Sequence, residues 1–385
     1  MAKRKQLAVW GLAAVLAATP TPAFAGSPEF ARTQEEWASL RDDRLEYDEI
    51  ADLIHEYNNT VIENQIAYRD EFDKDNDDIA QDYYDRADEI YGNIEYPDSD
   101  DSNYGSLMAA ALSSQIQADQ LMEQGDESTD DSETLKIGYD QTEAQLVQQA
   151  QEQMISYWSQ YYSLDSLRAQ KTQAEADLKK EENRVAAGTS TQSELLSARE
   201  TVSSAEASIL SAESSLAKTK ESLCLMLGWS YGADVEIGEL PEPDLESIDA
   251  IDLEADIQTA LDSNYAYKKT AKQLTNARTE TVRETLTQTQ KNQKEAIANS
   301  VQDSYSSLIL ARSDYQQAQQ ACEIQKNSYE SAARKLQAGT ITQNDYQTQE
   351  TSYQNAEVTV RTQKLALLEA MVDYQWAVAG LADAS

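Results

Sequence analysis

The sequence predicts an all-α protein in which long antiparallel coiled-coil hairpins form two tandem structural repeats. A short turn at 187–192 recurs with nearly the same residues at 338–343, an offset of 151 residues (338 − 187). Each turn lies between two long stretches without Gly or Pro, so each is expected to be a hairpin tip. Apolar or small residues recur at alternating steps of three and four beside both tips, which indicates supercoiled helices. After the first tip these positions are Val202, Ala205, Ile209, Ala212, Leu216, Thr219, Leu223 and Met226.

The first 25 residues are predicted to be a secretory signal peptide. Lys3, Arg4 and Lys5 precede an apolar run from 7 to 18, and Ala23 and Ala25 supply a small-x-small cleavage site. We therefore expect an exported protein of the cell envelope or cell surface. After cleavage, a polar leader at 26–44 is expected at the start of the mature chain. No later stretch approaches the about 18 apolar residues of a membrane helix, so no helical anchor is expected.

Acidic residues outnumber basic residues 69 to 31. Removal of three basic residues with the signal peptide leaves a net charge of 28 − 69 = −41. Nucleic acid and anionic lipid surfaces are therefore poor partners. Two interpretations of the acidity stay open, namely solubility of a long exposed surface and attraction of cations. The two cysteines are expected to be reduced, since Cys224 and Cys322 lie at different axial distances from their tips.

The first repeat is expected to span 45–228. An amphipathic helix is predicted from Leu45 to about Ile94, and the acidic segment around Pro97 breaks it. A helix of small residues follows at 106–122, and after a second acidic break the helix that leads to the first tip is expected to begin near Thr142. The return helix closes at Gly228.

Residues 229–252 contain Pro241 and Pro243 and are predicted to be a connector. The second repeat, 253–385, begins with a helix that ends at Asn264, and its long helical region reaches Gln337. If the topology matches the first repeat, the chain must reverse between these points, and the threonine-rich segment 279–290 is the expected place.

The sequence offers no catalytic constellation. His55 is the only histidine, which argues against histidine-based catalysis and zinc binding. The acidic run from Asp73 resembles the start of a calcium loop, but Asp78 stands where glycine is needed and Tyr84 where a bidentate acid is needed. We therefore expect a protein that is not an enzyme and that needs no cofactor or metal.

These features together resemble the TolC family of outer-membrane efflux proteins. The similarity covers nearly the whole mature chain: an Asn-terminated first helix, a tip with Gly and Thr, a Leu-Gly close, a connector with Pro, and the same order again. The resemblance implies a homotrimer in which each protomer gives two hairpins to a helical tube. It also implies docking of the tips on a periplasmic-adaptor-like (membrane fusion) protein that works with an ABC or RND transporter.

The site residues follow from the same resemblance. The adaptor-contacting tips correspond to Ala187, Gly188 and Thr189 in the first repeat and to Ala338, Gly339 and Thr340 in the second. Asp345 matches one of the family's entrance carboxylates, and Glu194 is its counterpart in the first repeat. An acid in the first turns of a helix is also favourable simply because of the helix dipole, so both interpretations stay open for these two carboxylates.

Two departures limit the resemblance. Thr348 stands where the family has a second entrance acid, and no segment between the helices has the alternating apolar pattern of a lipid-facing strand. We therefore expect a TolC-like α-barrel protomer without a clear transmembrane β-barrel, and direct membrane insertion is doubtful. A secreted coiled-coil scaffold or surface-interaction protein with no conduit is the alternative, because both functions need the heptads.

Overall fold

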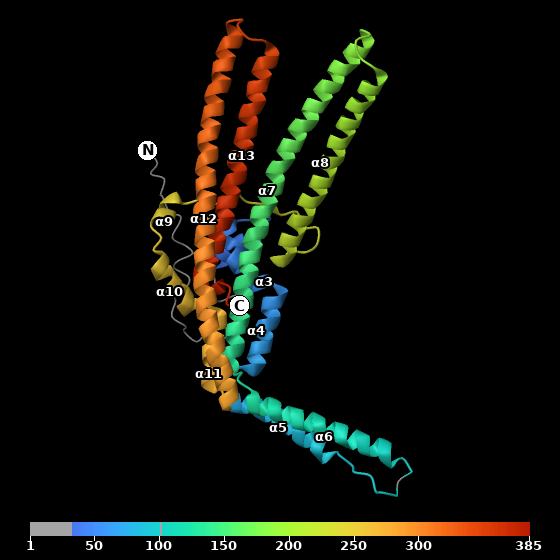
Figure 1. Ribbon diagram of the computed structural model, residues 1–385, viewed down its shortest axis with the longest axis vertical. Helices are drawn as coiled ribbons and strands as arrows, with labels where there is room; N and C mark the ends of the chain where they lie inside the picture. The colour runs from blue at the N-terminus through green and yellow to red at the C-terminus, as the bar shows by residue number, and fades with distance from the viewer. Residues whose placement is uncertain (1–32, 101) are drawn as a thin grey trace. The chain divides into compact units, whose positions relative to one another are not determined.

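The computed structural model describes residues 33–100 and 102–385, and this part of the chain is almost entirely helical (Figure 1). The predicted signal peptide and the start of the polar leader lie outside the described residues. The predicted all-α class is confirmed. The two described strands, β1 (Arg44–Leu45) and β2 (Glu236–Ile237), are two residues long and pair in parallel.

Contacts divide the chain into two compact units. One unit comprises the chain up to Asn59 together with 149–242, and the other comprises 60–148 together with 243–385. These units differ from the two predicted tandem repeats, whose boundaries stay a prediction. Helix α7 contributes residues to both units.

The first unit contains one helical hairpin and the segments that close its open end. Its helices are α2 (Gln34–Leu40), η2 (Tyr47–Glu49), α3 (Ile50–Tyr57), most of α7 (Ser132–Ala186) and α8 (Gln192–Met226). Ile50, Leu53 and Ile54 are fully buried on one face of α3, as the amphipathic pattern predicted. The Trp158 indole on α7 donates a hydrogen bond to the Gly238 carbonyl (2.9 Å) and thereby fixes the connector.

The second unit contains the other hairpin and its supporting helices. These are α4 (Asn59–Glu71), α5 (Asn76–Gly92), α6 (Tyr104–Glu127), α9 (Leu245–Asp249), α10 (Leu253–Ser263), α11 (Tyr265–Asn276), α12 (Glu280–Gln337), α13 (Gln343–Trp376) and η3 (Ala377–Leu381). A continuous core joins α10, α12, α13 and η3 through residues such as Ile297, Val301, Leu308, Leu367 and Met371. Burial of this apolar face drives the pairing of the long helices.

Two expectations about helix bounds need correction. The predicted helix from Leu45 to Ile94 is interrupted at Asn58, which has extended backbone angles, and again before α5 at Asp73, whose φ is 71°. Helix α7 begins ten residues before Thr142, because Asp131 accepts the Thr134 amide at 2.8 Å and caps the helix.

The reversal in the second repeat was expected at 279–290, and this prediction is wrong. Helix α11 ends at Asn276 and α12 begins at Glu280, so the break is confined to 277–279. Thr279 caps α12 by accepting the Val282 amide at 3.3 Å. The threonines that follow are helical, and their hydroxyls donate to carbonyls four residues earlier, as in Thr285 to Thr281 (2.9 Å).

The open ends of the two return helices close in the same way. The Asn58 side-chain amide donates to the Met226 carbonyl, and the Asn264 amide donates to the Ala382 carbonyl, both at 2.9 Å. Gly228 and Gly380 have φ values of 82° and 127°, and each packs against the residue that precedes the asparagine. A Cβ atom would lie 2.4 Å from Tyr57 at Gly228 and 2.7 Å from the Ser263 carbonyl at Gly380.

None of the helices in the described part combines the length and the apolar composition that a bilayer span requires.

Candidate functional site: the two hairpin tips

The first tip is a Schellman turn followed directly by a capped helix. Gly188 has a φ of 71°, its amide donates to the Val185 carbonyl (3.0 Å), and the Thr189 amide donates to the Arg184 carbonyl (2.8 Å). This pair of bonds satisfies the last carbonyls of α7. The Thr189 hydroxyl also donates to the Arg184 carbonyl, at 3.0 Å.

The second tip repeats this geometry in the other unit. Gly339 has a φ of 69°, its amide donates to Leu336 (2.9 Å), and the Thr340 amide and hydroxyl donate to the Lys335 carbonyl (2.9 and 3.0 Å). A Cβ atom on either tip glycine would meet nothing within 4 Å. The glycines are therefore required for the left-handed backbone and not for space.

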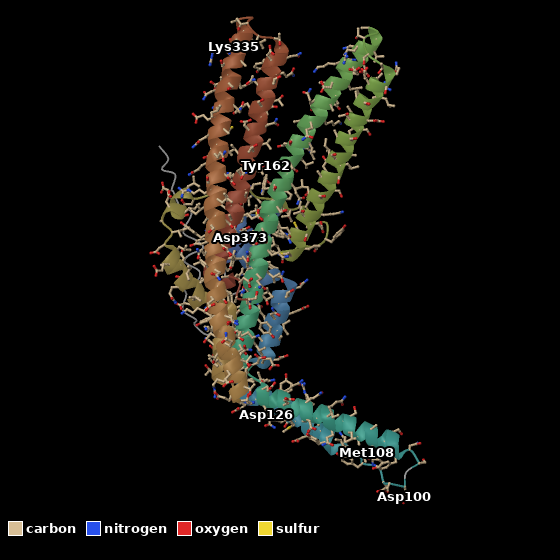
Figure 2. The ribbon with its side chains drawn as sticks, viewed as in Figure 1. Asp100, Met108, Asp126, Tyr162, Lys335 and Asp373 are labelled. Carbon is tan, nitrogen blue, oxygen red and sulfur yellow. The ribbon has the colours of Figure 1, made fainter. Side chains whose placement is uncertain are left out.

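The predicted contact residues of each tip are all exposed. Ala187, Gly188 and Thr189 come together at the end of the first hairpin, and Ala338, Gly339 and Thr340 at the end of the second. Lys335, on the last turn of α12, marks the position of the second tip in Figure 2. Because the amides of these residues are bonded within the turn, each tip presents mainly its small side chains to a partner.

Both predicted entrance carboxylates are capping-box residues. Glu194 accepts the Thr191 amide at 2.8 Å while the Thr191 hydroxyl accepts the Glu194 amide at 3.2 Å. Asp345 makes the same exchange with Thr342, at 3.0 and 3.2 Å. These contacts satisfy the first amides of α8 and α13. They give both acids a structural role, and a role at a pore entrance stays a prediction.

The environments of the two carboxylates differ at one position. The Ser190 hydroxyl donates to Glu194 at 2.6 Å and contacts Glu181 as well, whereas Ile341 occupies the corresponding place in the second tip. The bond from Ser190, followed by those from Thr191, lowers the pKa of Glu194 to about 2. The Thr342 amide and hydroxyl lower the pKa of Asp345 below its ordinary value. Both acids are therefore ionised at neutral pH.

The structure adds residues that sequence reasoning missed. Glu181 lies beside Glu194 through Ser190, and the Arg184 guanidinium pairs with Glu181 at 2.9 Å. The sequence signal was the spacing of Glu181 and Arg184 by three on the last turns of α7. A shallow groove of about 610 Å³ flanks the second tip and is lined by Ile324, Ser328, Ala332, Lys335, Ile341 and Asp345.

Metal-binding geometry is not found in the part of the chain that the structure describes, since no three His, Cys, Asp or Glu side chains converge there. The calcium-like run at Asp73 is explained locally: Asp75 accepts the Asp78 amide at 2.9 Å, and Asp78 accepts the Asp75 amide at 3.1 Å. This capping box begins α5. Cys224 and Cys322 are free thiols.

No family model matches the chain, and no curated protein is similar to it in sequence. Solved structures do share its fold. The outer membrane channel CmeC of Campylobacter jejuni aligns with a TM-score of 0.53 and 11% identity, covering 92% of this chain and 89% of CmeC. The outer membrane protein VceC of Vibrio cholerae gives a TM-score of 0.51 and 12% identity, covering 90% and 99%. The outer-membrane channel OprN gives 0.53 and 11%, covering 89% and 92%.

The chain therefore has a TolC-like fold. The likeness covers most of this chain and most of each channel, so it extends over both hairpins. The identities are low, and the comparison accordingly defines the class of fold alone. This fold class is the one that the paired tips and the heptads predicted.

Proposed function

We propose that this protein is a TolC-like efflux or export conduit component that assembles as a homotrimer and docks by its hairpin tips on an adaptor protein of an ABC- or RND-type pump. The observation that carries the proposal is the duplicated tip: two turns 151 residues apart have the same glycine backbone, the same threonine bonds and the same capping box. The fold likeness to outer membrane channels supports it.

The proposed role of the tips is based on their exposure and their small side chains. An exposed turn of Ala, Gly and Thr lets another polypeptide approach the backbone closely, with little side-chain entropy to lose. Glu194 and Asp345 lie in the first turns of α8 and α13, and each gives its tip a fixed negative charge. In a threefold assembly such acids would favour cations at the entrance. We place the assembly in the cell envelope, or in the outer membrane if the host has one.

The first test is the mass of the chain without its predicted signal peptide, residues 26–385, measured by light scattering over about two decades of concentration. A trimer that persists on dilution supports the tube. A monomer at every concentration contradicts it and favours the alternative, a secreted coiled-coil scaffold with no conduit.

The second test separates docking from folding. In the native host, deletion of the gene should increase retention of ethidium or remove components from the secreted fraction. A chain with Ala187→Arg and Ala338→Arg should fold and form trimers but fail to restore this phenotype, because two exposed cations disrupt the tip surface. The control is Ala250→Arg, at an exposed site in the connector. Restoration by the tip variant would rule out docking through the tips.

A further inference from the structure

The hairpin formed by α5 and α6 has no counterpart in the second repeat. We call residues 76–127 the arm. In the first repeat the arm connects α4 to α7, whereas three residues, 277–279, connect α11 to α12. The two positions correspond because Asn58 and Asn264, which make the same closure, precede α4 and α11. The arm is therefore an addition to one repeat, and the conduit proposal gives it no role.

The arm is a tightly packed unit. Ala80 and Ala87 on α5 face Ala111, Ala118 and Gly125 on α6, each spaced by seven residues, and all five are buried. These small side chains bring the helix axes close together. A Cβ atom on Gly125 would lie 2.3 Å from the Tyr84 ring, whose hydroxyl donates to Asp126 at 2.8 Å. Asp119, which lies seven residues before Asp126 on α6, accepts a hydrogen bond from the Tyr91 hydroxyl.

The base of the arm is fastened to the link between α11 and α12. The Arg278 guanidinium donates to the Gly125 carbonyl (2.8 Å), to the Asn76 carbonyl (2.8 Å) and to Asp77 (2.7 Å). The Asn276 amide donates to the Thr129 carbonyl at 3.0 Å and to Asp131 at 2.9 Å. Because Arg278 bonds both ends of the arm, the arm is held at its base.

The outer half of the arm concentrates exposed apolar side chains. Six of the sixteen large hydrophobic residues that are exposed in the described chain lie between 91 and 116. We call them the outer arm surface: Tyr91, Tyr96, Tyr104, Leu107, Leu112 and Ile116. Figure 2 shows Asp100 and Met108 at this outer end and Asp126 at the base. Solvent exposure of so many aromatic and aliphatic groups is typical of a contact surface.

Charge is distributed unevenly around this surface. The arm contains fourteen acidic residues and a single basic one, Arg86, which gives 1 − 14 = −13. Ten of the acids precede α6, and none lies between Tyr104 and Ala118, a stretch without any charged residue. Five exposed acids lie on α5 and the segment that follows it, and this segment lies beside the uncharged stretch of α6, since the Tyr96 hydroxyl donates to Gln115 at 3.2 Å. They are Asp85, Asp88, Glu89, Glu95 and Asp98.

We propose that the outer arm surface is a docking site for a basic amphipathic segment of another exported polypeptide. An exposed apolar surface that is rich in tyrosine and has exposed acids beside it is complementary to a helix with an apolar stripe flanked by Lys and Arg. A second copy would bring another arm of the same charge, and an anionic membrane would repel these acids. This proposal is independent of the conduit, because it needs neither the tips nor the trimer.

The test uses residues 26–385 and a fluorescent synthetic peptide of Leu and Lys with helical periodicity, followed by anisotropy. Binding should weaken by about tenfold or more in Leu112→Ser/Ile116→Ser and in Asp85→Asn/Asp88→Asn/Glu89→Gln. It should also weaken as salt rises from about 50 to about 300 mM, because the Debye length shortens. The matched controls are Leu210→Ser and Glu200→Gln, which alter exposed residues of α8 and should change binding by less than about twofold.

Several results would overturn the proposal. They are absence of peptide binding, equal effects in the arm variants and the controls, and no dependence on salt. Self-association in sedimentation velocity that Leu112→Ser/Ile116→Ser abolishes would identify a copy as the occupant. Binding to zwitterionic vesicles that the same variant abolishes would identify a membrane. Unchanged circular dichroism melting ensures that each variant is folded.

Discussion

The two hairpins share a tip but differ in the seam between their helices. At equivalent positions, 151 residues apart, the first hairpin has Leu178, Leu195 and Val202, and the second has Tyr329, Tyr346 and Tyr353. Tyr329 stacks on Tyr353 with ring centroids 5.5 Å apart, and its hydroxyl bonds that of Tyr346 at 2.9 Å.

The first hairpin has aliphatic residues at these positions, and it also has polar pairs between its helices farther from the tip. Lys171 pairs with Glu206 and Arg168 with Glu213, both at 3.1 Å. These pairs are exposed and contribute little each. The difference indicates that the turn is set by its local backbone requirement, while any chemistry that fits the heptad spacing can fill the seam.

The largest effects are expected where both repeats use a glycine for space as well as for backbone angle. Gly228→Ala and Gly380→Ala should each destabilise the chain by about 2–4 kcal/mol, because left-handed strain adds to overpacking. The tip variants Gly188→Ala and Gly339→Ala should cost only about 1 kcal/mol, since a Cβ atom there is unopposed. Urea unfolding measures both pairs. Equal losses at closures and tips would contradict the comparison.

The asparagine closures should be the next most sensitive. Asn58→Ala removes the side-chain donor of the partly buried Met226 carbonyl, and Asn264→Ala removes that of the buried Ala382 carbonyl; each change should cost about 1–3 kcal/mol. Thermal unfolding followed by circular dichroism gives the loss. Asn93→Ala is the control, since its amide bonds a carbonyl of its own helix at an exposed position. A similar loss of stability in Asn93→Ala would contradict the larger contribution expected of Asn58 and Asn264.

The tyrosine seam should make the second hairpin sensitive to high pH. The Tyr329 hydroxyl raises the pKa of Tyr346 to about 12, and Glu357 raises that of Tyr353 to about 12. A raised pKa in the folded state means that stability is fully present below the ordinary value of about 10 and is lost as pH rises toward 12. In a pH titration followed by tyrosinate absorbance, Tyr346 and Tyr353 should ionise at a higher pH than an ordinary tyrosine. Tyr329→Phe should lower the pH at which Tyr346 ionises. Titration of all tyrosines near 10 would contradict this.

The smallest effect concerns the tip carboxylates. Ser190→Ala should raise the pKa of Glu194 from about 2 toward its model-compound value, because the largest contribution comes from the Ser190 hydroxyl. The stability linked to Glu194 is present above its unfolded pKa and is lost as pH falls from about 4.3 through 2. Carboxyl chemical shifts in NMR report the change. Asp345, which has no such serine, is the internal control and should not move.

Prediction from sequence succeeded where the requirement is local. The glycine of each tip must adopt a left-handed backbone, and Thr191 and Thr342 stand three residues before an acid, so the turn and its caps are determined within a few residues. The same locality explains why α3 and its buried face were predicted. Asp345 and Glu194 were named from the family resemblance, and their function at a pore entrance stays a prediction.

Prediction failed where the partner is distant in sequence. Threonines at 279–290 indicated a break because they favour non-helical structure when considered alone, but their hydroxyls bond within α12. The real break at 277–279 is stabilised by acceptors 145–202 residues away, through Asn276 and Arg278. No local pattern contains that information.

The sequence by itself determined the two tips, the heptads and the helical class, because turn geometry and helical periodicity depend on neighbours within about seven residues. Only the tertiary structure decided where the second repeat reverses, how Arg278 holds the base of the arm, and that Asn58 and Asn264 close the two return helices. Each of these depends on a buried or partly buried polar group finding a partner far along the chain, and the cost of leaving such a group unpaired selects the arrangement.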